Sequence, residues 1–496
     1  MTKRPNVLFL MTDQHNSLSM GCAGHTTVRT PALDGLAAQG VRFTSAYCNN
    51  PICAPSRISF ATAQYPHTHG FLGNNNFEFE ERNSDTLAAV FRRHGYQTAL
   101  IGKAHMIRAW DNEGYEHLRY CDLCDSDRAD PTTNHYFQYL IENGVADAYE
   151  DGTLPRDSEA VRKKCAVAQL PYEHTNEHWT GEETLSFLEN RDQARPFLVH
   201  MTFERPHPHW TPAAEHADMY DPETIELGPD AVDWWENRWA GRPEFIMRAA
   251  ANRMRGFSLA DLKKAIAYHF ALVTVIDMEI GRVLDWLKEH GELDNTIVVY
   301  TADHGDFAGD HGICDKNMGI YESIHRIPFL LTYPGSPQGV TRDGIIESVD
   351  LFPTLCDLAS VPCPAGVDGR SVVPEAEGRG DGKPQAICEW DFPAPQRRVN
   401  AIRTPRHRLV YYSHEQGGEL YDHETDPYEM ENLWDSPAHR GARLALLEQL
   451  LDQVNLYRRK SDFDTDAVQA QRERYLPSRL LHKRCVKWSD IRDTFG

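Results

Sequence analysis

Five short, continuously apolar runs along the first 380 residues constrain the fold more than any other feature of the chain. They are Val7–Met11, Thr98–Ile101, Phe197–Phe203, Thr296–Thr301 and Phe329–Tyr333. Runs that are apolar at successive positions, rather than at alternate ones, are typical of strands covered on both faces. Helical segments separate them, and this alternation predicts an α/β fold built on a largely parallel central sheet flanked by helices.

The longest predicted helix runs from Ser258 to His290, where apolar residues recur at helical spacing before Gly291. After about residue 380 the pattern changes to short strand-like runs separated by turn residues. These runs are Ala401–Arg403, Leu409–Tyr412 and Glu419–Tyr421, and a helix is predicted after them from about Ala438 to Tyr457. We therefore expect a large α/β domain with the active site (1–380), a small C-terminal subdomain with an antiparallel sheet and a helix (381–460), and a basic tail (461–496).

The charge balance excludes some classes of partner. The formal net charge is −22, whereas proteins that bind nucleic acid present clustered Lys and Arg to the phosphates. No apolar stretch approaches the roughly 18 residues of a membrane helix, so we expect no membrane association. The apolar run near the N-terminus is shorter than a signal-peptide core, and we expect a cytoplasmic protein.

Eleven scattered cysteines do not describe a disulfide scaffold. Cys121 and Cys124 have the spacing of half a zinc site, but no second pair follows, so two ordinary thiols are expected. Two segments, 107–180 and 211–257, are rich in acidic residues and Trp. We interpret them as insertions over the carboxyl edge of the sheet, with most tryptophans in the core and one or two free to line a substrate pocket.

Polar clusters follow four of the predicted strands. They are Asp13 and Gln14, Lys103 and His105, His207 and His209, and Asp303 and His304, with Lys316 shortly after the last. Any one of them has an ordinary explanation, because a strand-end Asp often caps a helix and a His often satisfies a carbonyl. In open α/β sheets, however, ligands bind beyond the carboxyl ends of the strands. Four such clusters therefore indicate one site.

The chemistry of these residues suits ester hydrolysis. Asp13, Asp303 and His304 are oxygen and imidazole donors for a divalent cation, and cations neutralise charge on a sulfate or phosphate ester. Cys53-Ala54-Pro55-Ser56-Arg57 opens an apparent helix, where a cysteine has a depressed pKa. From spacing alone Cys53 is either a thiolate nucleophile or a buried cysteine.

The Cys-x-Pro-Ser-Arg motif at Cys53 resembles the pattern by which formylglycine-dependent sulfatases of the alkaline phosphatase superfamily mark their cysteine for oxidation. The other motifs occur in that family's order. They are Asn6–Gln14 (the opening strand), Gly102–His105 (Gly-Lys-x-His), Arg205–Pro208 (Pro-His), Ala302–Asp306 (the second metal motif), Asp350–Thr354 and Glu419–Asp422. The resemblance covers residues 5 to about 435, and it implies the alkaline-phosphatase-like fold.

The resemblance implies a reactive centre at Cys53. The cysteine would become formylglycine, whose hydrated gem-diol supplies the nucleophilic oxygen. Asp13, Asp303 and His304 would bind one divalent metal ion together with the oxygen of residue 53. Arg57 would steady the gem-diol and offset the negative ligands.

The resemblance also implies groups that hold the ester. Lys103 and His105 would flank its oxygens, and His105 would take a proton from the second hydroxyl as sulfate leaves. His207 and Lys316 would contact the bridging oxygen and assist the leaving group. Asn74, the first of three adjacent asparagines, resembles a substrate-binding asparagine of some members.

Two departures bear on the metal and the substrate. Gln14 stands where many arylsulfatases have a second Asp, and His304 stands where many have Asn. Both resemble choline sulfatases and phosphonate monoester hydrolases. Calcium is the expected metal, and manganese is compatible with an imidazole ligand. The basic pair Lys103 and His105 favours sulfate esters.

We therefore expect an arylsulfatase-like enzyme for small sulfate monoesters, with side activity on phosphonate monoesters and phosphodiesters. The expected partners are a formylglycine-generating maturation enzyme and further copies of the chain in a homo-oligomer. The alternatives are a phosphonate monoester hydrolase or phosphodiesterase using the same formylglycine, a thiol enzyme using unmodified Cys53, and a non-catalytic binding protein.

Overall fold

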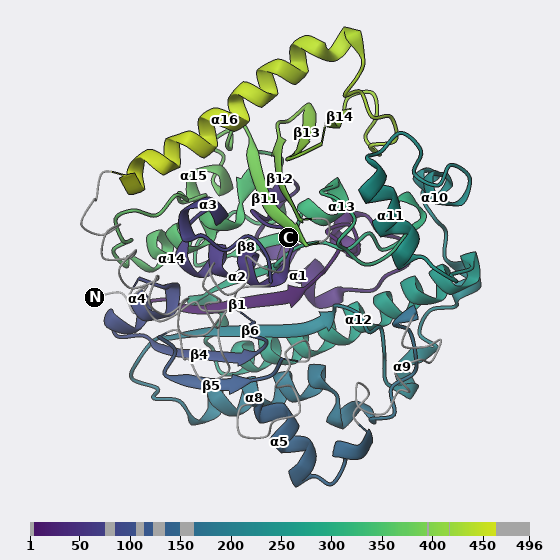
Figure 1. The fold of residues 1–496 in the computed structure, drawn as a ribbon. Helices are drawn as coiled ribbons and strands as arrows, with labels where there is room; N and C mark the ends of the chain where they lie inside the picture. Colours follow the sequence, from purple (N-terminus) through teal and green to yellow (C-terminus); the bar gives the residue numbers. More distant parts are fainter. Residues whose placement is uncertain are drawn as a thin grey trace, which may run out of the picture.

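An eight-stranded sheet forms the centre of the computed structural model, which describes residues 4–74, 85–105, 114–122, 134–148, 163–393, 396–415 and 417–462. Its strands, in spatial order, are β5 (His117–Tyr120), β4 (Gln97–Gly102), β6 (Phe197–Pro206), β1 (Asn6–Asp13), β7 (Thr296–Ala302), β8 (Phe329–Thr332), β2 (Val41–Phe43) and β9 (Val340–Arg342). Figure 1 shows β1, β6, β4 and β5 side by side across the middle of the molecule.

The first strand of the chain occupies the middle of this sheet. β1 pairs in parallel with β6 on one side and with β7 on the other, so that Val7 lies opposite Leu198 and Ile297. β4 and β5 continue the parallel part beyond β6, whereas β8 is antiparallel to β7. All five strands predicted from apolar runs are present, and the predicted α/β class with a largely parallel sheet is confirmed.

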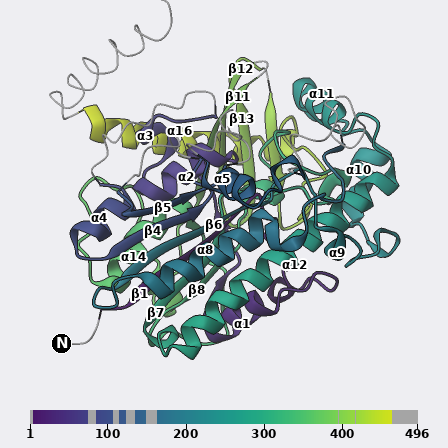
Figure 2. The ribbon, with the colours of Figure 1, turned by 90° about the horizontal axis from the view of Figure 1, so that it is seen from below.

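Helices cover both faces of the sheet, which explains why the strands are apolar at successive positions. Leu8 and Leu10 of β1 belong to the core beneath α1 (Pro31–Gln39), α8 (Asn176–Asn190) and α12 (Leu259–Glu289), which Figure 2 shows together on one face. The intervening residues, Val7, Phe9 and Met11, belong to the core beneath α2 (Cys53–Thr62), α4 (Leu87–Arg93) and α14 (Leu351–Ala359).

The long helix α12 begins and ends close to where its sequence predicts. Ser258 is its N-cap, and the Ser258 side chain and the Asp261 carboxylate form a reciprocal capping box. The helix ends before Gly291, which adopts a positive φ of 66°. A left-handed residue just past a helix end is best supplied by glycine.

A second, antiparallel sheet follows, formed by β11 (Ala386–Pro393), β12 (Gln396–Arg403), β13 (His407–Tyr412) and β14 (Gly418–Asp422). The sequence predicts three of these strands and misses β11. Helix α16 (Arg440–Asp462) packs against β12 and β13 and lies across the top of the molecule in Figure 1. The predicted antiparallel sheet and following helix are therefore confirmed.

The interpretation of 107–180 as an insertion is partly wrong, because β5 lies within it and pairs with β4 as an edge strand of the main sheet. Trp210, Trp234 and Trp239 are buried in one apolar core, as predicted for most tryptophans. Cys124 and the basic tail from residue 463 onward lie outside the described residues.

The remaining elements are short. A two-stranded sheet pairs β10 (Ile346–Glu347) with β3 (Ala46–Tyr47). The other α-helices of the described residues are α3 (Pro66–His69), α5 (His135–Glu142), α9 (Ala214–Ala217), α10 (Val232–Trp235), α11 (Glu244–Arg253), α13 (Glu322–His325) and α15 (Val373–Ala376). Within the described residues, no helix combines the length and apolar character needed to cross a bilayer.

Candidate active site

The carboxyl ends of four neighbouring strands bring the predicted polar clusters to one edge of the sheet. Asp13 ends β1, Lys103 follows β4, His207 follows β6, and Asp303 follows β7. Because β1 lies between β6 and β7, with β4 beyond β6, these ends are adjacent. The Nζ of Lys103 lies 2.8 Å from Oδ2 of Asp13, so clusters 90 residues apart in sequence meet.

Cys53 is the first residue of α2 and lies at the centre of this edge. Ile52 before it is extended, and Pro55 falls in the first turn, where its missing N–H costs nothing. The side chain of Ser56 donates a 2.6 Å hydrogen bond to the backbone carbonyl of Asp303, which ties the helix to the end of β7. Cys53 is 1% exposed.

Four donor atoms converge around Cys53. One donor atom from each of Asp13, Cys53, Asp303 and His304 lies within 4.8 Å of the others, and all four residues are buried. His304 Nδ1 contacts the carbonyl of Gly305 at 3.0 Å. Donation from Nδ1 leaves the lone pair on Nε2, which faces Cys53 Sγ at 3.3 Å. This is the tautomer that a metal-binding histidine needs.

Gln14 adds an oxygen that the sequence reading did not select as a ligand. Its Nε2 donates to Asp306 Oδ2 at 2.6 Å and to Asp315 Oδ1 at 3.0 Å, which fixes the amide orientation. Its Oε1 is buried and has no hydrogen-bond partner. An orphaned carbonyl oxygen beside Asp13 fits the carboxylate and imidazole donors as a further ligand of a hard divalent cation. In the sequence, only its position directly after Asp13 indicates that Gln14 could be a ligand.

Arg57 binds the carboxylates of this group from inside the protein. Its Nε donates to Asp303 Oδ2 at 2.8 Å, and its Nη2 donates to Asp13 Oδ2 at 3.3 Å. Its Nη1 donates to the backbone carbonyl of Lys103 and to Thr202 Oγ1, both at 2.9 Å. The guanidinium is 1% exposed. A planar fork of this kind holds two carboxylates at fixed angles, which a lysine could not do.

Lys316 approaches the same centre from the opposite side. Its Nζ lies 2.9 Å from Cys53 Sγ and 2.9 Å from His304 Nε2. Burial lowers the pKa of Lys316, but the negative charges of the site outweigh burial and raise it. Burial likewise disfavours the charged form of Asp13, yet Lys103 and the other cations hold the pKa of that carboxyl well below its usual value. Lys316 is therefore charged and Asp13 ionised at neutral pH.

His207 completes the rim of the site. Burial, reinforced by the positive charge of Lys316, holds the pKa of His207 well below its ordinary value. A neutral imidazole beside a charged lysine can accept or pass on a proton. Arg205 Nη1 donates to the carbonyl of His207 at 3.2 Å, which fixes the loop that carries it.

Two further predicted residues, His105 and Asn74, follow β4 and α3 in the chain. His105, two residues after Lys103, adopts a left-handed conformation with a φ of 46°. Asn74 lies beside Cys53, because its Oδ1 accepts a 3.3 Å hydrogen bond from the backbone N–H of Ala54. The neighbouring asparagines 75 and 76 lie outside the described residues.

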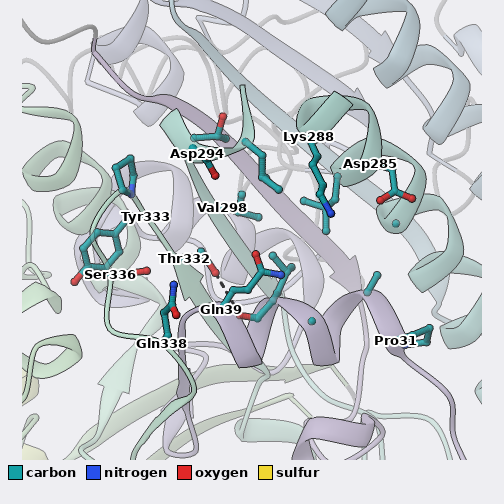
Figure 3. Close-up of a pocket in the computed structure, with 18 of the residues that line it drawn as sticks. Pro31, Gln39, Asp285, Lys288, Asp294, Val298, Thr332, Tyr333, Ser336 and Gln338 are labelled. Atoms are coloured by element: carbon teal, nitrogen blue, oxygen red, sulfur yellow. Dashed lines mark hydrogen bonds between the residues drawn. The ribbon is translucent and has the colours of Figure 1, made fainter. Parts of the chain in front are cut away.

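A cavity of about 750 Å³ lies away from this centre. Figure 3 shows Pro31 and Gln39 of α1, Lys288 of α12, and Thr332 at the end of β8 around it. Thr296 also lines it, so the cavity is at the amino end of β7, opposite the end that carries Asp303. The chemistry of the molecule is therefore not in this cavity.

Comparison with known families agrees with the geometry. The sulfatase family pattern matches residues 5–361. The chain belongs to the sulfatase family. A second pattern, described as the C-terminal part of N-sulphoglucosamine sulphohydrolase, matches residues 309–456. The sulfatase match spans the donor group at Cys53 and Lys316.

Relatives of this sulfatase extend over nearly its whole length. An N-acetylglucosamine-6-O-sulfatase of Bacteroides thetaiotaomicron is 29% identical, with 93% of this chain and 88% of the relative covered. An arylsulfatase of Clostridium perfringens is 30% identical, with 90% and 94% covered. Other relatives are named choline-sulfatase and phosphonate monoester hydrolase, so the predicted resemblance is confirmed.

Solved structures show the same fold. A protein bound to its substrate D-glucosamine-2-N,6-O-disulfate has a TM-score of 0.73 and 26% identity, with 94% of this chain and 99% of the other covered. A phosphonate monoester hydrolase from Silicibacter pomeroyi has a TM-score of 0.75 and 26% identity, with 91% and 95% covered. The protein is a sulfatase, an enzyme that hydrolyses sulfate esters.

Proposed function

We propose that this sulfatase cleaves sulfate monoesters at Cys53 after oxidation of that cysteine to formylglycine. The observation that carries the proposal is the buried group of Asp13, Cys53, Asp303 and His304, with Lys316 2.9 Å from Cys53 Sγ. Formylglycine supplies a hydrated aldehyde whose hydroxyl attacks sulfur. A thiol enzyme would not need the carboxylates and imidazole around the sulfur, and a binding protein would not need an activated nucleophile.

The donor set fits one divalent cation held by Asp13, Asp303, His304 and Gln14. Such an ion supplies Lewis-acid stabilisation of charge on the ester oxygens. Oxygen donors predominate, which favours calcium, whereas the His304 nitrogen also suits manganese. Arg57 keeps Asp13 and Asp303 in place for this purpose, because it donates to both.

The other side chains bind the ester and move protons. Lys103, 2.8 Å from Asp13, binds the sulfuryl oxygens, whereas Lys316, 2.9 Å from Cys53 Sγ, contacts the bridging oxygen. Lys316, which is charged, supplies the proton for the leaving oxygen, and the neutral His207 beside it can relay that proton. His105 accepts the proton that is released when sulfate departs, and Asn74 orients the ester beside the amino end of α2.

Two substrate classes follow from these contacts and relatives. The first is a sulfated amino sugar, since one relative is named N-acetylglucosamine-6-O-sulfatase and one solved structure holds a glucosamine disulfate. The second is a phosphonate monoester or phosphodiester, because Gln14 follows Asp13 and a phosphonate monoester hydrolase shares the fold at a TM-score of 0.75. Sulfate esters are proposed to be the better substrates, because the basic pair Lys103 and His105 suits a sulfuryl group.

Mass spectrometry of the tryptic peptide from residue 43 to Arg57 tests the modification. That peptide carries both Cys48 and Cys53. Conversion to formylglycine makes it about 18 Da lighter, and fragment ions place the change at position 53 while Cys48 serves as an internal control. An unconverted peptide in active enzyme would eliminate formylglycine from the mechanism.

A panel of N-acetylglucosamine 6-sulfate, 4-nitrophenyl sulfate and a 4-nitrophenyl phosphonate monoester tests the substrate. We expect the highest kcat/KM for a sulfate ester. A phosphonate that is better by more than tenfold would make phosphonate hydrolysis the main activity.

A further inference from the structure

Glu204 is a buried carboxylate that no step of the proposed reaction uses. It lies near the carboxyl end of β6, three residues before His207, and it is 1% exposed. Its Oε1 is 3.0 Å from Nζ of Lys103. A carboxylate in such surroundings costs free energy unless a cation compensates it. Its place beside an active-site lysine therefore calls for a functional explanation.

Lys103 lies between two carboxylates. On one side its Nζ is 2.8 Å from Asp13 Oδ2, and on the other it meets Glu204. The backbone fixes this arrangement, because Lys103 donates its N–H to the carbonyl of Thr202 at 3.0 Å, and Glu204 follows two residues later on the same strand. The negative charge of Asp13 is also compensated by Arg57 and by the cation that the donor group would hold. Glu204 is therefore the carboxylate whose charge offsets that of Lys103.

This pairing lowers the positive potential that an ester meets. A fixed negative charge repels a doubly charged ester more strongly than a singly charged one, since the interaction scales with the charge of the substrate. Sulfate monoesters carry one negative charge. Phosphate monoesters, whose second pKa is about 6, carry nearly two above pH 7. Removal of the Glu204 charge should therefore favour the phosphate ester over the sulfate ester.

We propose that Glu204 is a positioning residue that restricts the active site to singly charged esters, by holding Lys103 against Asp13 and cancelling its charge. This inference rests on the proposed function, because it takes Lys103 as a group that binds the ester. It assigns the substrate class by charge: sulfate monoesters, phosphonate monoesters and phosphodiesters are accepted, and phosphate monoesters are excluded.

The test compares Glu204→Gln with wild type in the matured holoenzyme at pH 8. We expect the ratio of kcat/KM for 4-nitrophenyl phosphate over 4-nitrophenyl sulfate to rise by roughly ten- to thirtyfold, as expected for one unit charge about 8–12 Å from the ester's charge at an effective dielectric constant of about 20. The dissociation constant of inorganic phosphate, measured by calorimetry, should fall in the same variant. Glu204→Asp keeps the charge and should stay near the wild-type ratio.

Glu279→Gln is the matched control. Glu279 is also a fully buried glutamate in an ion pair, but it lies on α12 and contacts Arg282 and His178 instead of Lys103. The ratio of kcat/KM for the phosphate ester over the sulfate ester should be the same in Glu279→Gln as in wild type. A Glu204→Gln ratio within about threefold of wild type, or an equal change in Glu279→Gln, would overturn the proposal.

A second pair of variants keeps the test decisive if Glu204→Gln does not fold. Lys103→Met with Glu204→Gln removes both partners, which leaves no unpaired buried charge. Its selectivity ratio should exceed that of Lys103→Met alone by the same factor, and equal ratios would overturn the proposal. If wild type cleaves only phosphonates, the proposed sulfate specificity fails, and the Glu204 comparison is then made with the phosphonate as the singly charged ester.

Discussion

Replacement of Arg57 by Met should separate the stability of the site from its catalysis. The guanidinium donates to Asp303, Asp13, Thr202 and the carbonyl of Lys103 from a fully buried position. Loss of one partner of a buried ion pair costs about 3–5 kcal/mol, because the other charge is left uncompensated. We expect a loss of that size in the free energy of unfolding by urea, and a fall in kcat/KM of about 10²–10³ as both carboxylates lose their orientation.

Two companion variants show whether the loss of activity comes from the lost ion pairs of Arg57 or from lower stability in general. Arg57→Lys keeps the charge but cannot reach four acceptors, so it should lose less stability and still lose activity. Arg191→Met removes another buried arginine, which pairs with Glu292 away from the site. It should lose a comparable amount of stability and keep its kcat/KM. If the free energy of unfolding of Arg57→Met is within about 1 kcal/mol of the wild-type value, the guanidinium does not compensate the two carboxylates and the reasoning is wrong.

Three further predictions follow from the same geometry. Lys316→Ala should lower kcat/KM for sulfate esters by about 10²–10³ without unfolding the protein, as measured by steady-state kinetics and circular dichroism. Asp303→Asn should reduce the metal content of purified enzyme, which elemental analysis measures, because Asp303 supplies a charged donor atom to the buried group. Burial raises the pKa of Asp277 to about 7 against the backbone N–H donors of Ala32 and Leu33. The folded state thus holds a proton that the unfolded chain releases near pH 4. The contribution of Asp277 to stability should fall as pH rises from about 4 to about 7, and Asp277→Asn should remove this contribution from the pH dependence of urea unfolding across pH 5–8.

The sequence predicts a residue's place in the fold correctly where the residues next to it in the chain already determine that place. The apolar runs at Val7–Met11 and Thr296–Thr301 mark strands buried on both faces, and a polar residue directly after such a strand must lie at the carboxyl edge. This rule selects Asp13, Lys103 and Asp303 from the sequence, and the structure brings all three together.

The sequence predicts less where a residue's environment depends on a partner far away in the chain. β11 was missed because Glu389 and Asp391 give it a polar appearance, yet Glu389 is buried against His67, some 320 residues earlier in the chain. Gln14 is a departure from a motif in the sequence, and only the contacts of its amide nitrogen with Asp306 and Asp315 show that its buried oxygen is left without a partner. Glu204 carried no signal at all, because a glutamate near a strand end is ordinary until its lysine is seen.

The central position of β1 has a consequence for synthesis. Lys316, which lies against the Cys53 sulfur, emerges from the ribosome 263 residues after it. At typical elongation rates of 5–20 residues per second, that delay is on the order of 10–50 s. During this interval β1 lacks β7, its partner on one side, and α2 has no closed site to enter. Once the chain has folded, Cys53 is 1% exposed. The proposed oxidation of Cys53 would therefore have to take place on the nascent or unfolded chain, and the yield of active protein would then depend on a race between that oxidation and folding.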